Sequence, residues 1–208
     1  MKNLAQSLLG LLIICSSALA LNSHAYTVSD VELSEVVPAT AERPELSLNG
    51  ASLRELYLLV ETYVGALYLE NPSTDPKEIT ESETHKRMVF HVMLKKVGAR
   101  RIANALQEAL VVNLTEEEHK ELTPKLDQML SHFNGKMHAG EEAIFDYIPG
   151  VGTRITINND VKGVITGKKY FQAMLSIWVG ENPVGRSFKE DILGLNRKSA
   201  ASSLVADN

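Results

Sequence analysis

Two side chains in the first third of the chain have the chemistry of a binding pair, Arg54 and Tyr63. A guanidinium beside an apolar stretch is suited to holding a carboxylate through two parallel hydrogen bonds. The hydroxyl of Tyr63 adds a third donor. A plainer interpretation is that Arg54 pairs with Glu55 or Glu61 at the surface and that Tyr63 belongs to the core. The residue types alone leave both interpretations open.

The spacing of this pair places a condition on the backbone. In one straight strand, residues separated by an odd number of positions point to opposite faces, and this holds for Arg54 and Tyr63. A shared site therefore requires a bulge or a turn between them, which we expect between Glu55 and Leu58.

Other residue patterns give little chemistry. No histidine pair has the HExxH spacing of a zinc helix, and His132 and His138 are separated by a helix stop at Gly135, so we predict no metal site. His91 is interpreted as a sheet residue rather than a general base. The segment 150–152 (Gly-Val-Gly) is interpreted as a hairpin turn rather than a dinucleotide loop. We predict no cofactor and assign no catalytic residue.

The composition is that of an ordinary globular protein. The chain has 208 residues, of which 44% are hydrophobic and 23% are charged. Its formal net charge of −5 argues against nucleic acid as a partner, because phosphate neutralisation requires an excess of Lys and Arg. A single cysteine excludes a disulfide framework within the chain.

The first 25 residues have the pattern of a secretory signal peptide. Lys2 precedes an apolar run over 8–21, and the segment 23–25 (Ser-His-Ala) supplies the small-x-small cleavage pattern. An uncleaved anchor, a cut after Ala20 and lipidation at Cys15 are the alternatives. We expect an exported protein with no membrane span after cleavage. It would be periplasmic in a Gram-negative cell and secreted otherwise.

The remaining chain predicts strands, then helices, then strands and a last helix. We expect an edge strand within 26–43, a short strand stopped by a turn at Asn49-Gly50, and a strand over 57–69 covered on both faces. An acidic helix over 75–83 and a strand over 87–95 follow. This grouping predicts an α+β fold with helices on one face of a mainly antiparallel sheet.

The second half of the chain contains stronger local indications of secondary structure. Thr115 and Glu118 predict a capping box, and Pro124 predicts the start of a new helix capped by Thr123. Three strands over 143–165 form a meander, and an apolar stripe predicts a helix that ends at Gly180. We expect one domain over 26–195 and a polar, disordered tail over 196–208.

Four segments, taken together and in order, resemble the bacterial chalcone isomerase-like family. They are 48–54 (LNGASLR), 63–69 (YVGALYL), 147–153 (YIPGVGT) and 177–180 (IWVG). The resemblance implies an open-faced sandwich, in which a large antiparallel sheet carries a layer of helices. Members of this fold include isomerases that close chalcones to flavanones and fatty-acid-binding proteins that hold a carboxylate with an arginine and a tyrosine.

The resemblance also assigns roles to positions. Arg54 matches the arginine that both groups share, and Tyr63 falls where the fatty-acid binders have tyrosine and the isomerases threonine. The isomerase tyrosine and asparagine would align near Ile102 and Ala109, which are apolar here. Losing such groups removes about two to four orders of magnitude of catalytic help.

We therefore expect a binding domain for a fatty acid or similar amphipathic carboxylate. Arg54 and Tyr63 would hold the head group, and apolar residues of 57–69, 99–112 and 168–180 would enclose the tail. One alternative is an isomerase of the intramolecular lyase type, acting on a small phenolic or enone compound. Another is a structural or interaction domain with a filled core. An apolar pocket of roughly 300 Å³ or more near Arg54 would favour the binding domain.

Overall fold

The computed structural model describes residues 25–57 and 59–197. The predicted signal peptide lies outside these residues except for Ala25, which begins strand β1 (Ala25–Val28). The predicted tail begins at residue 196, and Arg197 donates hydrogen bonds to the backbone oxygen of Leu48 (2.8 Å) and to Glu35 (3.0 Å). The rest of that tail, 198–208, lies outside the described residues.

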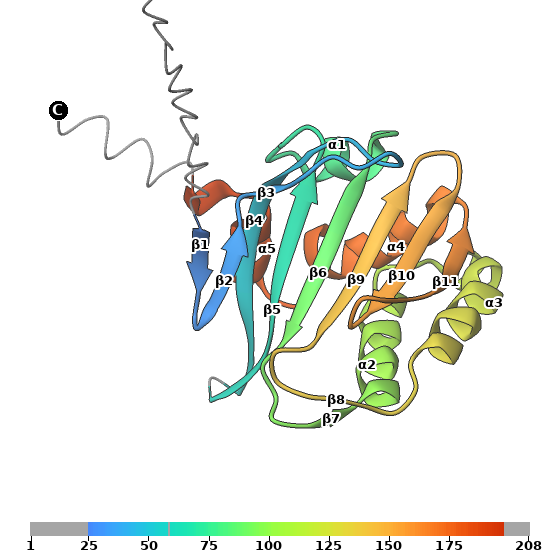
Figure 1. Cartoon of the computed structure of the whole chain (residues 1–208). Helices are drawn as coiled ribbons and strands as arrows, with labels where there is room; N and C mark the ends of the chain where they lie inside the picture. Colours follow the sequence, from blue (N-terminus) through green and yellow to red (C-terminus); the bar gives the residue numbers. More distant parts are fainter. Residues whose placement is uncertain (1–24, 58, 198–208) are drawn as a thin grey trace, which may run out of the picture.

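An antiparallel sheet of seven strands forms the centre of the molecule (Figure 1). Its strands lie in the order β11-β10-β9-β6-β5-β4-β3, and every neighbouring pair is antiparallel. The predicted meander is present as β9, β10 and β11. The strand bounds are Val36–Val37 (β3), Leu46–Leu56 (β4), Val60–Leu69 (β5), Lys86–Val92 (β6), Glu142–Ile148 (β9), Gly152–Ile157 (β10) and Asp160–Thr166 (β11).

Helices cover one face of this sheet (Figure 1), and the predicted α+β open-faced sandwich is confirmed. The helices α2, α3 and α4 form the layer, α5 packs on β4, and α1 contacts α4. Two small antiparallel pairs complete the fold. The bounds are Pro76–Glu81 (α1), Ala99–Val111 (α2), Glu116–His132 (α3), Lys168–Val179 (α4), Arg186–Ile192 (α5), Val31–Ser34 (β2, paired with β1), Val97–Gly98 (β7) and Lys136–Met137 (β8, paired with β7).

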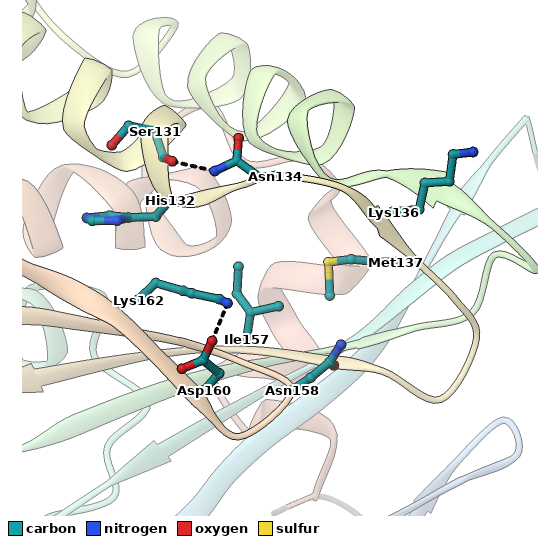
Figure 2. A pocket seen from close by; sticks show the side chains of 9 residues that line it. All are labelled: Ser131, His132, Asn134, Lys136, Met137, Ile157, Asn158, Asp160 and Lys162. Atoms are coloured by element: carbon teal, nitrogen blue, oxygen red, sulfur yellow. Dashed lines mark hydrogen bonds and ion pairs between the residues drawn. The ribbon is translucent and has the colours of Figure 1, made fainter.

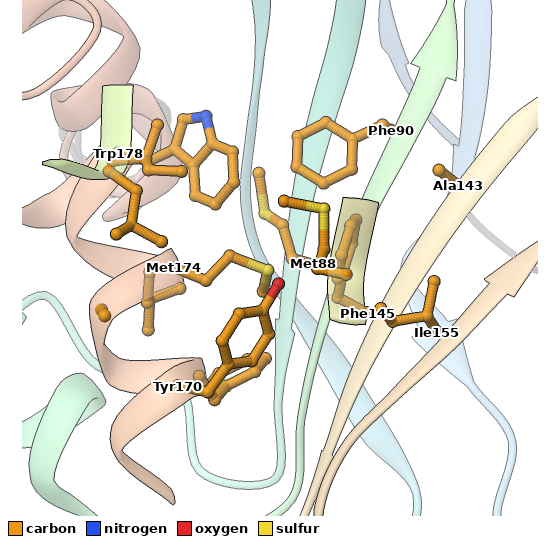
Figure 3. Packing of buried hydrophobic residues seen from close by; sticks show 14 of the residues in the cluster. Met88, Phe90, Ala143, Phe145, Ile155, Tyr170, Met174 and Trp178 are labelled. Atoms are coloured by element: carbon orange, nitrogen blue, oxygen red, sulfur yellow. The ribbon is translucent and has the colours of Figure 1, made fainter. Parts of the chain in front are cut away.

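Helix α4 supplies the centre of the main core. Its predicted apolar stripe is fully buried, and the neighbouring Tyr170 is buried as well. Figure 3 shows Trp178, Met174 and Tyr170 of α4 facing Met88, Phe90 and Phe145 of the sheet. The rings of Phe90 and Trp178 have centroids 5.0 Å apart. This packing fixes the helix layer against β6 and β9.

The strand predicted over 57–69 is covered on both faces, as expected, but it begins at Val60. Leu67 and Leu69 belong to the core under the helices. Val64 and Ala66 pack on the opposite face, together with Leu33 of β2. Successive side chains of a strand alternate between faces, so one apolar stretch serves two cores.

The turn predicted at Asn49-Gly50 is wrong, because β4 continues through both residues to Leu56. The side chain of Asn49 donates to the backbone oxygen of Ile192 at 2.9 Å and accepts from the backbone nitrogen of Ser73 at 2.9 Å. A shift in register at this point leaves Gly50 opposite Leu67. Tertiary contacts with α5 thus replace the local turn that this dipeptide favours.

Gly50→Ala is expected to lower the free energy of unfolding by about 3 kcal/mol. A Cβ atom at this position would lie 2.0 Å from the backbone oxygen of Asp191, so α5 would have to move away from β4. Chemical denaturation measures the change. Gly98→Ala is the control, since no heavy atom lies within 4 Å of a Cβ there, and its loss should be much smaller. Equal stability losses in the two variants would contradict this packing.

Helix α3 also differs from the prediction, because it runs through Pro124 without a new start. The capping box at its beginning is confirmed: Thr115 accepts from the backbone nitrogen of Glu118 at 3.2 Å, and the Glu118 carboxylate accepts from that of Thr115 at 2.8 Å. The hydroxyl of Thr123 donates to the backbone oxygen of His119 at 2.8 Å. Buried residues on both sides of the exposed proline, Leu122 and Leu126, hold the two halves of the helix in line.

Candidate functional site

The hairpin of β4 and β5 brings Arg54 and Tyr63 together. The two residues are direct partners in the antiparallel register, so their side chains project from the same face. The predicted turn between them is present after Leu56, and a register shift lies between Arg54 and Glu55. This geometry removes the parity problem of a single straight strand.

Arg54 and Tyr63 line a cavity of about 600 Å³ between the sheet and the helix layer. Most of its wall is apolar, and helix α2 provides one side of it. The elements expected to enclose a ligand tail all contribute, with Val60 from β5 and Ile177 from α4. The residues that define the wall on α2 and β6 are Ile102, Ala105, Leu106, Ala109, Phe90 and Val92. This cavity disagrees with a filled core without a pocket, which was one of the alternatives.

The guanidinium of Arg54 has no acidic partner among the described residues. Its Nη1 donates to the backbone oxygen of Glu55 at 2.7 Å, and no described carboxylate lies within 4.0 Å of it. The side chain of Glu61 instead accepts from the hydroxyl of Ser29 at 3.2 Å. The expected surface ion pair of Arg54 with Glu55 or Glu61 is thus not formed, and the remaining N–H groups of the guanidinium are available.

Tyr63 is held firmly beside this arginine. Its ring makes edge contacts with Phe90 and Phe188, with centroids 5.3 and 5.9 Å away. Its hydroxyl accepts a hydrogen bond of 3.1 Å from the indole nitrogen of Trp178. Burial raises the pKa of Tyr63 to about 12, despite opposing effects of Trp178 and Arg54. The hydroxyl therefore keeps its proton at neutral pH and remains a hydrogen-bond donor.

Tyr63→Phe is expected to reduce the loss of stability at alkaline pH. The unfolded chain releases the tyrosine proton near the ordinary tyrosine pKa of 10.0, whereas folded Tyr63, with its raised pKa, holds it up to about pH 12. Within this window the unfolded state binds fewer protons, so stability falls as pH rises. Denaturation at several pH values should show a smaller fall in Tyr63→Phe. Tyr57→Phe is the control, since that side chain is 91% exposed; identical profiles for both variants would contradict the burial of the Tyr63 hydroxyl.

Ile102 and Ala109, near which the resemblance would align the isomerases' tyrosine and asparagine, are both part of the cavity. Both also pack partly against the main core. Besides Tyr63, the only neutral polar side chain of the described wall is that of Thr62. Its hydroxyl donates to the backbone oxygen of Arg54 at 2.6 Å. The wall as described contains no Asp, Glu or His.

The sequence interpretation missed two further cations of this cavity, Lys96 and Arg101. Both are exposed residues, one in the loop before β7 and one in the first turn of α2. One feature of the sequence could have indicated them. A helix N-terminus favours acidic side chains, but the first turn of α2 has none and carries arginines instead. Together with Arg54, Lys96 and Arg101 make the cavity strongly favourable for an anion.

A second cleft, of about 500 Å³, lies between the end of α3 and the β10–β11 turn (Figure 2). Most of its polar side chains are exposed, and Lys162 pairs with Asp160 at 2.5 Å. The buried Nε2 of His132 has no hydrogen-bond partner among the described residues, and the ring lies against Gly163. Without an apolar enclosure, this cleft is a weaker candidate for a ligand site.

The part of the chain that the structure describes offers neither a metal site nor a membrane-spanning helix. No three side chains of His, Cys, Asp or Glu gather there in a way that could hold a metal ion. No described helix combines the length and the apolar character needed to span a bilayer. His91, interpreted as a sheet residue, lies in β6, and its Nδ1 is 3.0 Å from Oε1 of Glu142 on the neighbouring strand β9.

These features define an open-faced sandwich with a cavity between its two layers. The family model of chalcone isomerase-like proteins matches residues 25–194, and the chain belongs to that family. Among solved structures it is similar to a fatty-acid binding protein of Arabidopsis thaliana, with a TM-score of 0.64, 16% sequence identity, and coverage of 79% of this chain and 92% of that one. At this identity the likeness concerns the fold. No curated protein sequence matches the chain.

Proposed function

We propose that this protein binds a fatty acid or a similar amphipathic carboxylate in the cavity beside Arg54. The head group accepts hydrogen bonds from the guanidinium of Arg54 and from the hydroxyl of Tyr63. The tail lies along the apolar wall formed by β5, β6 and α2. The solved neighbour of the same fold is a fatty-acid binding protein, which supports this class of ligand.

One observation carries the proposal: a cation without an acidic partner among the described residues stands beside a protonated phenol at the edge of an apolar cavity of about 600 Å³. Ligand pockets of about 300–1,000 Å³ with a few convergent polar groups are typical for small molecules. Charge-assisted hydrogen bonds from arginine are stronger than neutral ones, and the apolar surroundings strengthen them further. The head group and the tail are thus recognised by different parts of one site.

The isomerase alternative receives less support. Ring closure of a phenolic substrate needs groups that organise a water or polarise a ketone, and the resemblance would align those groups near Ile102 and Ala109, two apolar residues of the cavity. The described wall offers cationic and phenolic donors but no carboxylate or imidazole that could act as a general base. Incubation with chalcones, followed by their absorbance, tests this alternative directly.

We also propose that the protein is exported and acts outside the cytoplasm. The support is the basic start, the apolar run over 8–21 and the small residues at 23–25. The mass of the purified chain, expressed with its own N-terminus, tests processing. A mass that corresponds to loss of the first 25 residues, or of the first 20, agrees with export and cleavage, whereas an intact N-terminus would contradict cleavage of a signal peptide.

Lipid extraction of the purified protein, followed by mass spectrometry, tests the proposed ligand class. A fatty acid or related carboxylate should co-purify with the wild-type protein and be depleted in Arg54→Ala. The proposal fails if no acid co-purifies and if uptake of added palmitic acid is the same in the wild type and in Arg54→Ala.

A further inference from the structure

The turn between β4 and β5 exposes a group of large apolar side chains, which we name the hairpin tip: Leu56, Tyr57, Leu59 and Val60. Tyr57 is 91% exposed and Leu59 is 86% exposed, the highest values among the large apolar residues described. The other exposed apolar residues, such as Val151 and Val112, stand apart from one another along the chain. Isolated apolar residues at a surface are ordinary, whereas a contiguous group indicates an interaction site.

The backbone of the hairpin tip is unusual for its sequence. Tyr57 has a φ of 55°, and the backbone nitrogen of Leu59 donates to the oxygen of Leu56 at 3.3 Å. A tight turn with positive φ normally uses Gly, Asn or Asp, because bulky side chains are strained there. The segment 56–60 reads LYLLV and contains none of these residues. Apolar side chains are therefore kept at this turn against its local conformational preference.

Basic residues lie at the same end of the molecule as the hairpin tip. Figure 1 shows the β4–β5 turn, β7 and the start of α2 at the same end of the molecule. The nearby acidic residues are Glu55 and Glu61 of the hairpin and Asp30, whose neighbour Ser29 donates to Glu61, while Glu141 and Glu142 are each paired with a histidine. Although the whole chain has a net charge of −5, the segments at this end carry five basic side chains with no ion pair among the described residues: Arg54, Lys95, Lys96, Arg100 and Arg101.

The hairpin tip is continuous with the ligand cavity. Leu56 and Val60 belong to both, since they line the cavity and are also 42% and 44% exposed. Lys96 and Arg101 line the same cavity and are exposed as well. An apolar molecule could thus pass from the tip into the cavity along apolar side chains, past cations that line the same cavity.

We propose that the hairpin tip docks on the surface of a bilayer that contains anionic lipids. Tyr57 and Leu59 enter the boundary between head groups and acyl chains, and Lys95, Lys96 and Arg101 contact the anionic head groups. The cavity then opens toward the membrane, where amphipathic carboxylates reside. This role in ligand exchange rests on the proposed function, but the docking itself does not.

A bilayer suits this surface better than a protein partner. The apolar residues are exposed at a turn between two strands, with basic residues at the same end of the molecule, so they can enter a fluid interface while the charges remain at its surface. A protein partner would need a matching apolar hollow and acidic rim. The negative surface potential of an anionic bilayer attracts each basic residue that lies near it, so the contributions of the five cations add to that of the apolar tip.

Co-sedimentation with vesicles tests the docking, without added ligand. The full chain is mixed with vesicles of equal parts phosphatidylcholine and phosphatidylglycerol, or of phosphatidylcholine alone. We expect binding to the anionic vesicles that weakens with salt, and about a tenfold or greater loss in Leu59→Glu and in Lys95→Glu. Val151→Glu is the control, because Val151 is 48% exposed in the β9–β10 turn at the other end of the sheet. All variants share one N-terminus, so the apolar run over 8–21 contributes equally.

The outcomes separate docking from ligand binding. Equal sedimentation of Leu59→Glu, Val151→Glu and the wild type would overturn the docking proposal, as would wild-type protein that stays in solution. A wild-type dimer that Leu59→Glu dissociates would overturn it in favour of a second copy of the chain. Palmitic acid binding is measured separately in the absence of vesicles and should be unchanged in Leu59→Glu. A wild-type protein that binds the acid but no vesicles refutes docking alone, and one that binds vesicles but no acid refutes the proposed function alone.

Discussion

Arg54→Met is expected to weaken the binding of palmitic acid by about 100-fold. The substitution keeps an apolar side chain of similar length at the cavity but removes the guanidinium, which has no acidic partner among the described residues. Hydrogen bonds to charged groups contribute about 1.5–3 kcal/mol, and each 1.4 kcal/mol is a factor of ten in affinity. Isothermal titration calorimetry measures the change.

A matched control and a matched ligand make this result specific. Arg186→Met removes an exposed arginine of α5 that does not line the cavity, and its affinity should equal that of the wild type. The fatty alcohol of the same chain length lacks the carboxylate, so Arg54→Met should affect its binding much less. Equal effects of Arg54→Met on the acid and the alcohol would contradict recognition of the head group.

Ala109→Phe is expected to weaken palmitic acid binding by about 100-fold or more. Ala109 lines the cavity from α2, and a phenyl ring there occupies space that the tail requires. Each buried methylene group contributes about 0.8 kcal/mol, so displacing three or four of them removes roughly a factor of 100. A fatty acid with a short chain should lose much less affinity, because its tail ends before the obstruction.

Glu108→Phe is the control for this variant. Glu108 is the exposed neighbour of Ala109 on α2 and does not line the cavity. Thermal unfolding establishes that both variants keep the fold. Binding of palmitic acid by Ala109→Phe with wild-type affinity would show that the tail lies elsewhere, even if Arg54 holds the head group.

Strong local signals predicted much of this fold. The meander depends on the turns at Pro149-Gly150 and Asn158-Asn159, where Gly150, Asn158 and Asn159 have positive φ. The capping box of α3 and the apolar stripe of α4 are also local patterns. In each case the residues nearby in the sequence favour the same conformation that the tertiary structure requires, so the prediction and the structure agree.

The errors arose where tertiary contacts oppose the local preference. Asn49-Gly50 has the sequence of a turn but continues a strand, because α5 packs directly on Gly50 and hydrogen-bonds to Asn49. The true hairpin turn, at Tyr57, has no turn-forming residue. Pro124 lies inside α3, where buried residues on either side outweigh its cost. Patterns within a short window do not contain these contacts.

The candidate site was predictable in part. Arg54 and Tyr63 were identified from their chemistry and from the family resemblance, and the pairing of β4 with β5 then explains how they share one face. Lys96 and Arg101 were missed because they approach the cavity from a loop and a helix that are distant in sequence from the hairpin. Side chains that meet only through the tertiary fold leave no common spacing in the sequence.

The most direct test uses palmitic acid that carries carbon-13 at its carboxyl group. Nuclear magnetic resonance follows the signal of this carboxyl group. With the wild-type protein we expect a separate bound signal, and the pKa of the bound acid should lie below that of the free acid because Arg54 favours the carboxylate. In Arg54→Met this bound signal should be lost or should titrate at a higher pH. An absent bound signal in the wild type, or one that is identical in Arg54→Met, would contradict the proposed role of Arg54.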